Sequence, residues 1–190
     1  EKLIERDLPI TTKAVLIEGL HATAWLEGED QLSLQQLLPL PRFGPAAPKM
    51  VLRRVEVNLV DGVASHRPIA AELDEVMITN STEDAGAVNQ VIALKGSADF
   101  ADEIRVRVDD FRGNLDVRCS LKGAHLNRDL IERMPPQWRA KLSDARGLQC
   151  VCDATLAMRR QADGNINYQV RTKIHDGRFE HPVLPKPISE

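Results

Sequence analysis

Aromatic residues are scarce in this 190-residue sequence, at 4% of the chain. Sugar-binding platforms depend on aromatic faces, so this scarcity argues against a carbohydrate-binding domain. No hydrophobic run approaches the roughly 18 residues of a membrane-spanning helix, and no signal peptide is recognisable. The net charge is −3 and the basic residues are dispersed along the chain. Since phosphate neutralisation needs a concentrated basic footprint, we expect no nucleic-acid partner.

Motifs that carry enzymatic or metal chemistry are also missing. The sequence has no G-x-S-x-G, glycine-rich phosphate loop, H-E-x-x-H or C-x-x-C. Asp163-Gly164-Asn165 resembles part of a calcium loop, but the remaining oxygen ligands are absent, which favours a hairpin turn. The isolated histidines are His21, His66, His125, His175 and His181. We therefore expect no enzyme, with no catalytic residue, cofactor or metal site.

The three cysteines, Cys119, Cys150 and Cys152, all fall on the apolar phase of predicted strands. Residues two apart in a strand are roughly 6.5 Å apart, which is near the upper limit for a disulfide. A C-x-C pair can contribute to a soft metal site, but neither a second pair nor a nearby histidine accompanies it. The favoured interpretation is three small, buried hydrophobic side chains.

Residues 146–177 predict one long β-hairpin. Apolar residues occupy every second position from Leu148 to Met158 and again from Ile166 to Ile174, interrupted at Thr172. This is the period of strands with one buried face, and residues 162–165 supply the turn. Three prolines then follow Asp176-Gly177 within six residues, so residues 178–190 are expected to leave the sheet as an extended segment.

The same two-residue period recurs earlier, over residues 49–60, 69–79, 88–98, 104–108 and 115–121. It slips between Leu73 and Val76, which predicts a bulge near Asp74-Glu75. Residues 1–48 predict two short strands, one or two helical turns within 30–39, and a proline-rich loop. Residues 127–145 predict two short helices, the first capped by Asn127. The whole chain is expected to form one mainly β segment: an antiparallel meander with two or three short helices.

Each predicted strand has one aliphatic face and one face of charged and polar residues. Two arrangements can remove the aliphatic faces from water. They can pack against a second sheet to form a β-sandwich core, or they can line a trough that another apolar molecule covers. The sequence pattern alone leaves both outcomes open.

Three phrases of the sequence resemble the AsmA-like proteins and related bridge-like lipid-transfer proteins of bacterial envelopes. The first is Ser33–Pro39 followed, after a proline-rich loop, by Val51–Gly62; it resembles the family's short helix and "v.i....v.l.dg" strand. The second is Asn127–Trp138 ahead of a Gly147-Leu148 strand, similar to the helical insert of these proteins. The third is Asp176–Ile188, which resembles the "l.dgrf..p.lP.Pl.dv.G" link between successive sheet segments.

This resemblance implies a curled, groove-like antiparallel sheet with an aliphatic concave face and a hydrated convex face. It implies a non-catalytic segment that offers a groove for phospholipid acyl chains in inter-membrane lipid transport and outer-membrane assembly. The expected partners are a phospholipid or another acyl-chain lipid and the flanking segments of the same longer chain. The expected location is the periplasm or cell envelope. The parent chain is expected to be anchored in the inner membrane by a helix that this sequence, which begins at Glu1, does not contain.

The residues expected to line the groove share the apolar phase of their strands. They are Val55, Val57, Leu59, Ile104, Val106, Val108, Leu115, Val117, Leu121, Leu148, Leu156, Ile166, Tyr168, Val170 and Ile174. The alternative hypothesis is a carbohydrate-binding or adhesion-type β-sandwich domain, in which the same residues form a closed core. A hydrolase on a β-scaffold is a further rival, for which the sequence offers neither a nucleophile nor a metal constellation.

Overall fold

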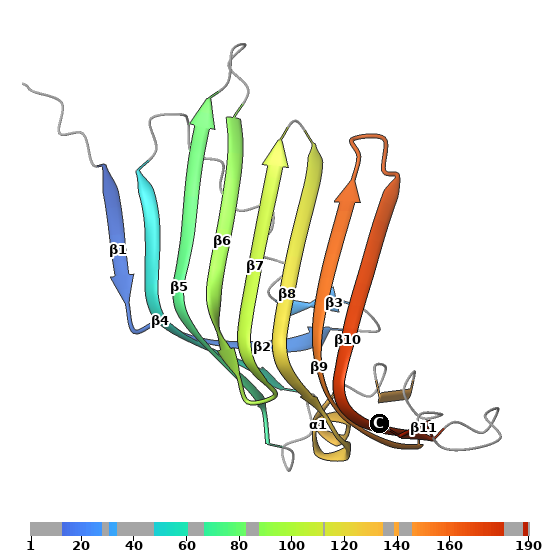
Figure 1. The fold of residues 1–190 in the computed structure, drawn as a ribbon. Coiled ribbons are helices and arrows are strands. Elements are labelled where there is room, and N and C mark those ends of the chain that lie inside the picture. Colours follow the sequence, from blue (N-terminus) through green and yellow to red (C-terminus); the bar gives the residue numbers. More distant parts are fainter. Residues whose placement is uncertain are drawn as a thin grey trace, which may run out of the picture.

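A computed structural model describes residues 13–27, 31–33, 48–60, 67–82, 88–111, 113–134, 139–140, 146–180 and 188–189. The described strands form one open 11-stranded sheet in the order β11-β10-β9-β8-β7-β6-β5-β4-β2-β3, with β1 also paired to β4 (Figure 1). The elements are β1 Ala14–Glu18, β2 His21–Glu27, β3 Gln31–Leu32, β4 Lys49–Val60, β5 Ile69–Thr82, β6 Val88–Ala98, β7 Ala101–Phe111, β8 Asn114–Leu126, α1 Arg128–Arg133, β9 Arg146–Arg160, β10 Ile166–Glu180 and β11 Ile188–Ser189.

Strands β4 to β10 form an antiparallel meander, because each pairs with the strand that follows it in sequence. The prediction of a mainly β, antiparallel sheet is therefore confirmed. The basis of this prediction is the alternation of apolar and polar residues, which is typical of strands that bury only one face.

The edge beside β4 is made by two short strands that run parallel to it. β1 pairs with Lys49–Arg53 and β2 with Glu56–Val60. Between them, Gly19 adopts a φ of 71° and its N–H donates to the carbonyl of Arg53, with 3.0 Å between N and O. Local sequence predicts both strands but not their parallel pairing, which joins residues more than 30 positions apart.

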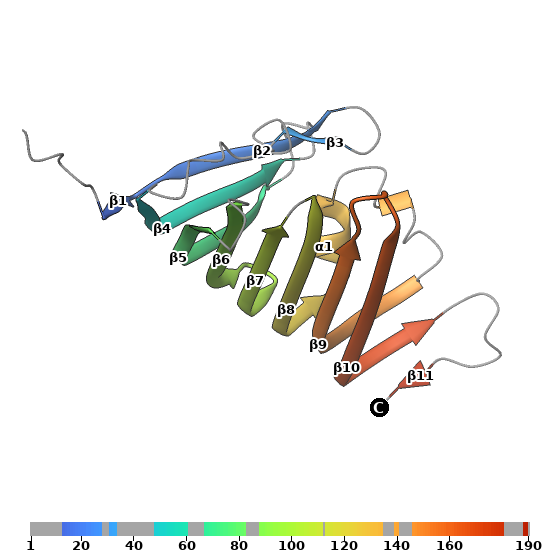
Figure 2. The same cartoon turned by 90° about the horizontal axis from the view of Figure 1, so that it is seen from above.

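The sheet bends along a line that crosses the strands. Figure 2 shows β8, β9 and β10 each as two arms that meet at an angle. Extra residues interrupt the pairing along this bend line: between Leu73 and Glu75 in β5, Ala101 and Ile104 in β7, Leu121 and Ala124 in β8, and Ile174 and Asp176 in β10. Bulges bend strands, so their alignment across neighbours folds the whole sheet. The bulge predicted at Asp74-Glu75 is confirmed as one of them.

β4 makes the same bend by a different route. Arg54 has a φ of 53°, in the left-handed region that non-glycine residues seldom occupy. Its neighbours Arg53 and Val55 pair with Glu75 and Leu73, so the bend lies opposite the bulge of β5. The Arg54 guanidinium donates to Glu18 across the edge of the sheet, with 2.9 Å between Nη2 and Oε2.

The most buried side chains lie inside the bend, where the two arms of the sheet meet. Most of these side chains are small, which lets the two arms approach each other. The cluster consists of Ala101, Ala124, Cys150 and Cys152, with Phe100, Ile104, Leu121 and Leu126 packed against it. Ile104 and Leu121 lie before the bulges and Leu126 and Cys150 beyond them, so residues from both arms pack on one face. That face is therefore the concave one. The three cysteines are free. Their prediction as buried hydrophobic side chains is confirmed for Cys150 and Cys152, whereas Cys119 is only partly buried.

One short helix, α1, lies at the lower end of the sheet in Figure 1. As predicted, Asn127 caps it: the side-chain oxygen accepts from the Leu130 N–H at 2.9 Å. Leu130 is buried, and Arg133 pairs with Asp99 in the β6–β7 turn. The structure shows fewer helices than the two or three expected, because α1 is the only complete helix among the described residues. Arg139 and Ala140, within the predicted second helix, are helical, and its other residues, 135–138 and 141–145, lie outside the described part. None of the described helical residues belongs to a helix long and apolar enough to cross a membrane.

Two further predictions need correction or fall outside the described residues. Asp176-Gly177 does not end the hairpin, because β10 absorbs one extra residue at His175 and continues to Glu180. β11 then pairs with Arg178 and Phe179, while residues 181–187 are outside the described part. Gln31–Leu32, at the start of the predicted helical turns within 30–39, form β3 instead, and residues 34–39 are not described.

Candidate ligand-binding face

Two rows of apolar side chains cross the concave face from β1 to β10. Directly paired residues of neighbouring strands share a face of the sheet, so the register identifies the members of each row. The upper row is Val15, Met50, Ile78, Ile92, Val108, Val117, Met158 and Tyr168; the lower row is Ile17, Leu52, Val76, Leu94, Val106, Cys119, Leu156 and Val170. All members of both rows, eight in each, are apolar or amphipathic, and we call them the aliphatic face.

The aliphatic face is least covered at its β9–β10 end. Leu156 is 36% exposed, Val170 58% and Tyr168 76%. On the same face of β10, Ile166 is 57% and Ile174 54% exposed. Thr172 separates Val170 from Ile174, so the uninterrupted part of this exposed strip on β10 is Ile166, Tyr168 and Val170. Since water contacts with large apolar side chains are unfavourable, such a strip is typical of a surface that binds something apolar.

Polar side chains border the aliphatic face on the side of the hairpin tips. Asn80, Gln90 and Asp110 occupy paired positions on β5, β6 and β7, one row above the upper row. The Gln90 side-chain amide donates to the Asn80 oxygen at 3.3 Å, and Gln90 is buried. On β9, Arg160 continues this border. The apolar surface thus changes to a polar rim over one row of residues.

The register places most of the predicted lining residues on this one face. Val106, Val108, Val117, Leu156, Tyr168 and Val170 belong to the two rows, and the paired Ile104 and Leu121 lie next to the bend. Leu115 and Ile166 lie in the row of the polar rim, and Ile174 pairs with the buried Cys152. Leu148 is in β9, but its side chain is outside the described ones.

Val55, Val57 and Leu59 lie beyond the bend, on the second arm of the sheet. They pair with Leu73, Ala71 and Ile69 of β5, on the same face. Val55 is 4% exposed and Ile69 8%, so this part is closer to a packed core than to an open surface. The structure therefore separates these residues from the open strip on β9 and β10.

The sequence interpretation missed ten of the sixteen residues of the aliphatic face. The residues not predicted as lining are Val15, Ile17, Met50, Leu52, Val76, Ile78, Ile92, Leu94, Cys119 and Met158. Alternation was visible for Ile92 and Leu94, and for Cys119 within its strand. For β4 and β5, the extra residues at Arg54 and Asp74 shift the phase, so Leu52 and Val55 share a face despite an odd spacing.

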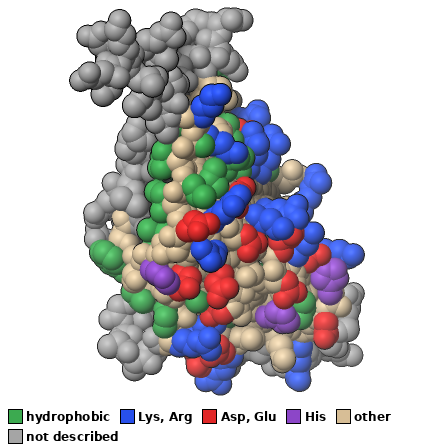
Figure 3. All heavy atoms as spheres, turned by 90° about the vertical axis from the view of Figure 1, so that its left-hand side faces the viewer, with side chains coloured by type: hydrophobic (Ala, Val, Ile, Leu, Met, Phe, Trp, Pro, Cys, Tyr) green, Lys and Arg blue, Asp and Glu red, His purple; other side chains and the backbone are tan. Residues whose placement is uncertain are grey.

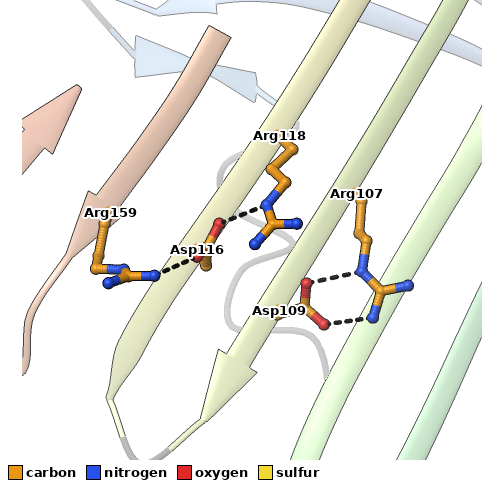
Figure 4. A network of polar contacts seen from close by, with 5 residues as sticks. All are labelled: Arg107, Asp109, Asp116, Arg118 and Arg159. Atoms are coloured by element: carbon orange, nitrogen blue, oxygen red, sulfur yellow. Dashed lines mark hydrogen bonds and ion pairs between the residues drawn. The ribbon is translucent and has the colours of Figure 1, made fainter. Parts of the chain in front are cut away.

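The opposite, convex face carries most of the charged residues. Figure 3, seen from the β1 side, shows hydrophobic side chains gathered toward the left and charged ones toward the right. Arg107 donates to both oxygens of Asp109 at 2.8 Å (Figure 4). Asp116 lies between Arg159 at 3.0 Å and Arg118 at 3.4 Å. The hydrogen bond from Arg159 is the main cause that lowers the pKa of Asp116, and Asp109 raises the pKa of Arg107.

Asp153 connects three strands at the bend line. One carboxylate oxygen accepts from the backbone N–H of Gly123 on β8 at 3.0 Å. The other lies 2.8 Å from Nε2 of His175 on β10. The Gly123 hydrogen bond first, and His175 second, lower the pKa of Asp153 below its ordinary value of 3.8. The ionised carboxylate therefore stabilises the bulges on both sides of β9.

Replacing Asp153 by asparagine is expected to lower the melting temperature at neutral pH and to change its dependence on pH. A carboxyl whose pKa is lower in the folded state stabilises the fold above its ordinary pKa, and this contribution disappears as the pH falls below it. The difference in melting temperature between Asp153→Asn and the wild type should therefore shrink below about pH 4. Circular dichroism melts from pH 3 to 7 measure it. A difference that is constant over this range would contradict the argument.

The described residues contain no group of three or more histidine, cysteine, aspartate or glutamate side chains that could hold a metal ion. Burial raises the pKa of the Cys119 and Cys152 thiols, which keeps them protonated and weakly nucleophilic at neutral pH. The chemistry of the described site is thus one of apolar contact on the concave face and charge on the convex face.

Comparison with known proteins adds no relative: no family model, curated protein sequence or solved structure matches this chain.

Proposed function

We propose that the aliphatic face holds the acyl chain of a lipid, and that the protein is a non-catalytic lipid carrier. The observation that carries this proposal is the unbroken apolar composition of both rows, together with their exposure on β9 and β10. At about 4.8 Å per strand, the seven strands from β4 to β10 give rows roughly 29 Å long, enough for an extended acyl chain to lie across them.

Elementary energetics supports an acyl chain as the occupant. Each methylene removed from water contributes about 0.8 kcal/mol, so ten methylenes contribute roughly 8 kcal/mol without any hydrogen bond. The rows contain no charged side chain that such a chain would have to desolvate. Binding of this kind has low chemical specificity, in agreement with the lack of a catalytic motif.

The polar rim provides polar contacts for the headgroup of a lipid whose acyl chain lies on the aliphatic face. A chain that lies on the upper row has Asn80, Gln90 and Asp110 beside it on one side, and Arg160 toward the β9–β10 end. A phospholipid has one polar and one apolar part, and the sequence of polar rim, aliphatic face and buried bend matches this division.

The resemblance to AsmA-like proteins extends the proposal to its biological setting. We propose that the chain acts in the cell envelope, in lipid transport between membranes and assembly of the outer membrane, as a segment of a longer, membrane-anchored protein. The open bent sheet with an apolar concave face supports this function better than a carbohydrate-binding β-sandwich, whose closed core would cover the strip on β9 and β10.

Native mass spectrometry of the protein purified from a bacterial host tests the proposal. We expect a population whose mass exceeds that of the polypeptide by one or more phospholipids, and the same lipids in an organic extract. The control is the same protein after delipidation, which should take up phospholipid from added vesicles. A single unliganded mass, with no uptake from vesicles by a protein that melts cooperatively, would contradict the proposal.

A further inference from the structure

We infer that the convex face contains a second binding site, for a phosphate group, in a basic depression across β6 to β10. This site lies on the other side of the sheet from the aliphatic face and does not depend on the function proposed above. The depression encloses about 760 Å³. The side chains that surround it from this face are Ala93, Lys95, Arg105, Arg107, Arg118, Ser120, Thr155, Ala157, Gln169 and Arg171.

The composition of this lining is suited to an anion. Five of the side chains are cationic, and three more (Ser120, Thr155 and Gln169) are neutral hydrogen-bond donors, while none is a carboxylate. The overall charge of the protein is −3, so the basic residues of the depression are a local concentration against an acidic background. Small residues between the cations leave the space: Ser120 pairs with Thr155, and Ala157 with Arg118 and Gln169.

On this face, charged residues in two directly paired positions of β7 and β8 have the same sign, an arrangement that is unfavourable for the stability of the sheet. Arg107 and Arg118 are directly opposite each other on β7 and β8, and two residues further along Asp109 is directly opposite Asp116. Like charges in directly paired positions destabilise a sheet, whereas exchanging one arginine with its neighbouring aspartate would pair opposite charges. This arrangement leaves Arg107 and Arg118 as a basic pair on neighbouring strands (Figure 4), and both line the depression, where a bound anion would offset their repulsion.

The acidic residues around the depression hold the arginines in place and leave donors for a ligand. Glu103 pairs with Arg105 at 2.7 Å, and Asp109 with Arg107 at 2.8 Å. Arg118 contacts Asp116 through Nε, at 3.4 Å, and Figure 4 draws no contact from its two terminal nitrogens to the other residues shown. Among the described residues, no carboxylate pairs with Arg171, which is exposed on β10.

These donors match phosphate better than a single carboxylate. A phosphate monoester has up to two negative charges and three acceptor oxygens, and arginine can contact it with two parallel hydrogen bonds. The cations come from four strands, β6, β7, β8 and β10, which span roughly 19 Å at 4.8 Å per strand. A free phosphate compound and a phospholipid headgroup share this chemistry, and the test below distinguishes them.

The experiment measures binding of inorganic pyrophosphate by isothermal titration calorimetry at physiological salt. We expect saturable binding by the wild type and binding at least about tenfold weaker for Arg118→Gln and Arg171→Gln. Arg128→Gln is the matched control: it removes the same charge from an exposed arginine of α1, outside the depression. Because Arg171 is exposed and unpaired with a described carboxylate, its variant should fold even if that of Arg118 does not.

Flotation with vesicles identifies the source of the phosphate. One set of vesicles contains phosphatidylcholine alone and the other adds phosphatidic acid, whose headgroup is a phosphate monoester. Retention on the second set only, lost in Arg171→Gln and kept in Arg128→Gln, would identify a lipid headgroup; pyrophosphate binding without retention would identify a soluble phosphate compound. The inference is overturned if pyrophosphate does not bind, or if Arg171→Gln and Arg128→Gln weaken binding equally.

Discussion

Replacing Gly96 by alanine is expected to lower the free energy of unfolding by about 3 kcal/mol. Gly96 lies at the bend line of β6, where β5 has its bulge. A Cβ atom there would overlap the carbonyl oxygen of Glu72 and lie 2.6 Å from the Cα of Leu73. Both are backbone atoms of a paired strand, so no side-chain rotation relieves the contact. For a chain of this length, the melting temperature should fall by roughly 6–12 °C.

Gly164→Ala is the control for this prediction. Gly164 is in the hairpin turn between β9 and β10 with a φ of 89°, and nothing lies within 4 Å of a Cβ built there. Alanine therefore incurs only the conformational penalty of positive φ, about 1 kcal/mol. If thermal melts by circular dichroism show equal losses for both variants, the close approach of β5 and β6 at the bend is not what requires glycine.

The second large effect is expected on lipid binding. Val170→Asp places a carboxylate in the lower row of the aliphatic face, where an acyl chain would have to desolvate it. Because Val170 is 58% exposed, the substitution should cost little stability. We expect the fraction of protein that co-purifies with phospholipid to fall at least about tenfold, measured by native mass spectrometry and by lipid extraction.

Asn167→Asp is the matched control, since it adds the same charge to the same strand on the opposite face. Asn167 pairs with Arg159, outside the basic depression, so the new carboxylate has a cation beside it. This variant should keep the lipid content of the wild type. Equal lipid loss in both variants would show that charge on β10, rather than its aliphatic face, governs the lipid content. Unchanged lipid in Val170→Asp would contradict the assignment of this face.

The meander could be predicted from the sequence because its information is local. The alternation in residues 104–121 identifies β7, β8 and the face of each side chain, and the phase slip at Asp74 identifies the bulge. Asn127 was recognisable as a helix cap because an asparagine side chain can satisfy a free N–H of the first turn. In each case the residues that determine the structure are within a few positions of one another.

The bend and the edge could not be predicted in the same way. The parallel pairing of β1 and β2 with β4 depends on contacts across more than 30 residues, on which local periodicity has no bearing. A bend line needs aligned irregularities in several strands, here five of the seven from β4 to β10, and Arg54 gives no sign of its positive φ in the sequence. The basic depression was missed for a similar reason: its cations come from four strands and are dispersed in sequence, although the register brings them together.

The bend line also has a mechanical consequence. A flat sheet is only one layer thick, so it bends easily about an axis parallel to its strands. A plate creased across the strands has a V-shaped cross-section, and its stiffness along the crease rises steeply with the depth of the V. The aligned irregularities from Arg54 to His175 thus form the fold line that makes the sheet resist bending along this direction. A sheet folded in this way stays straight in the direction across its strands even where nothing covers its concave face.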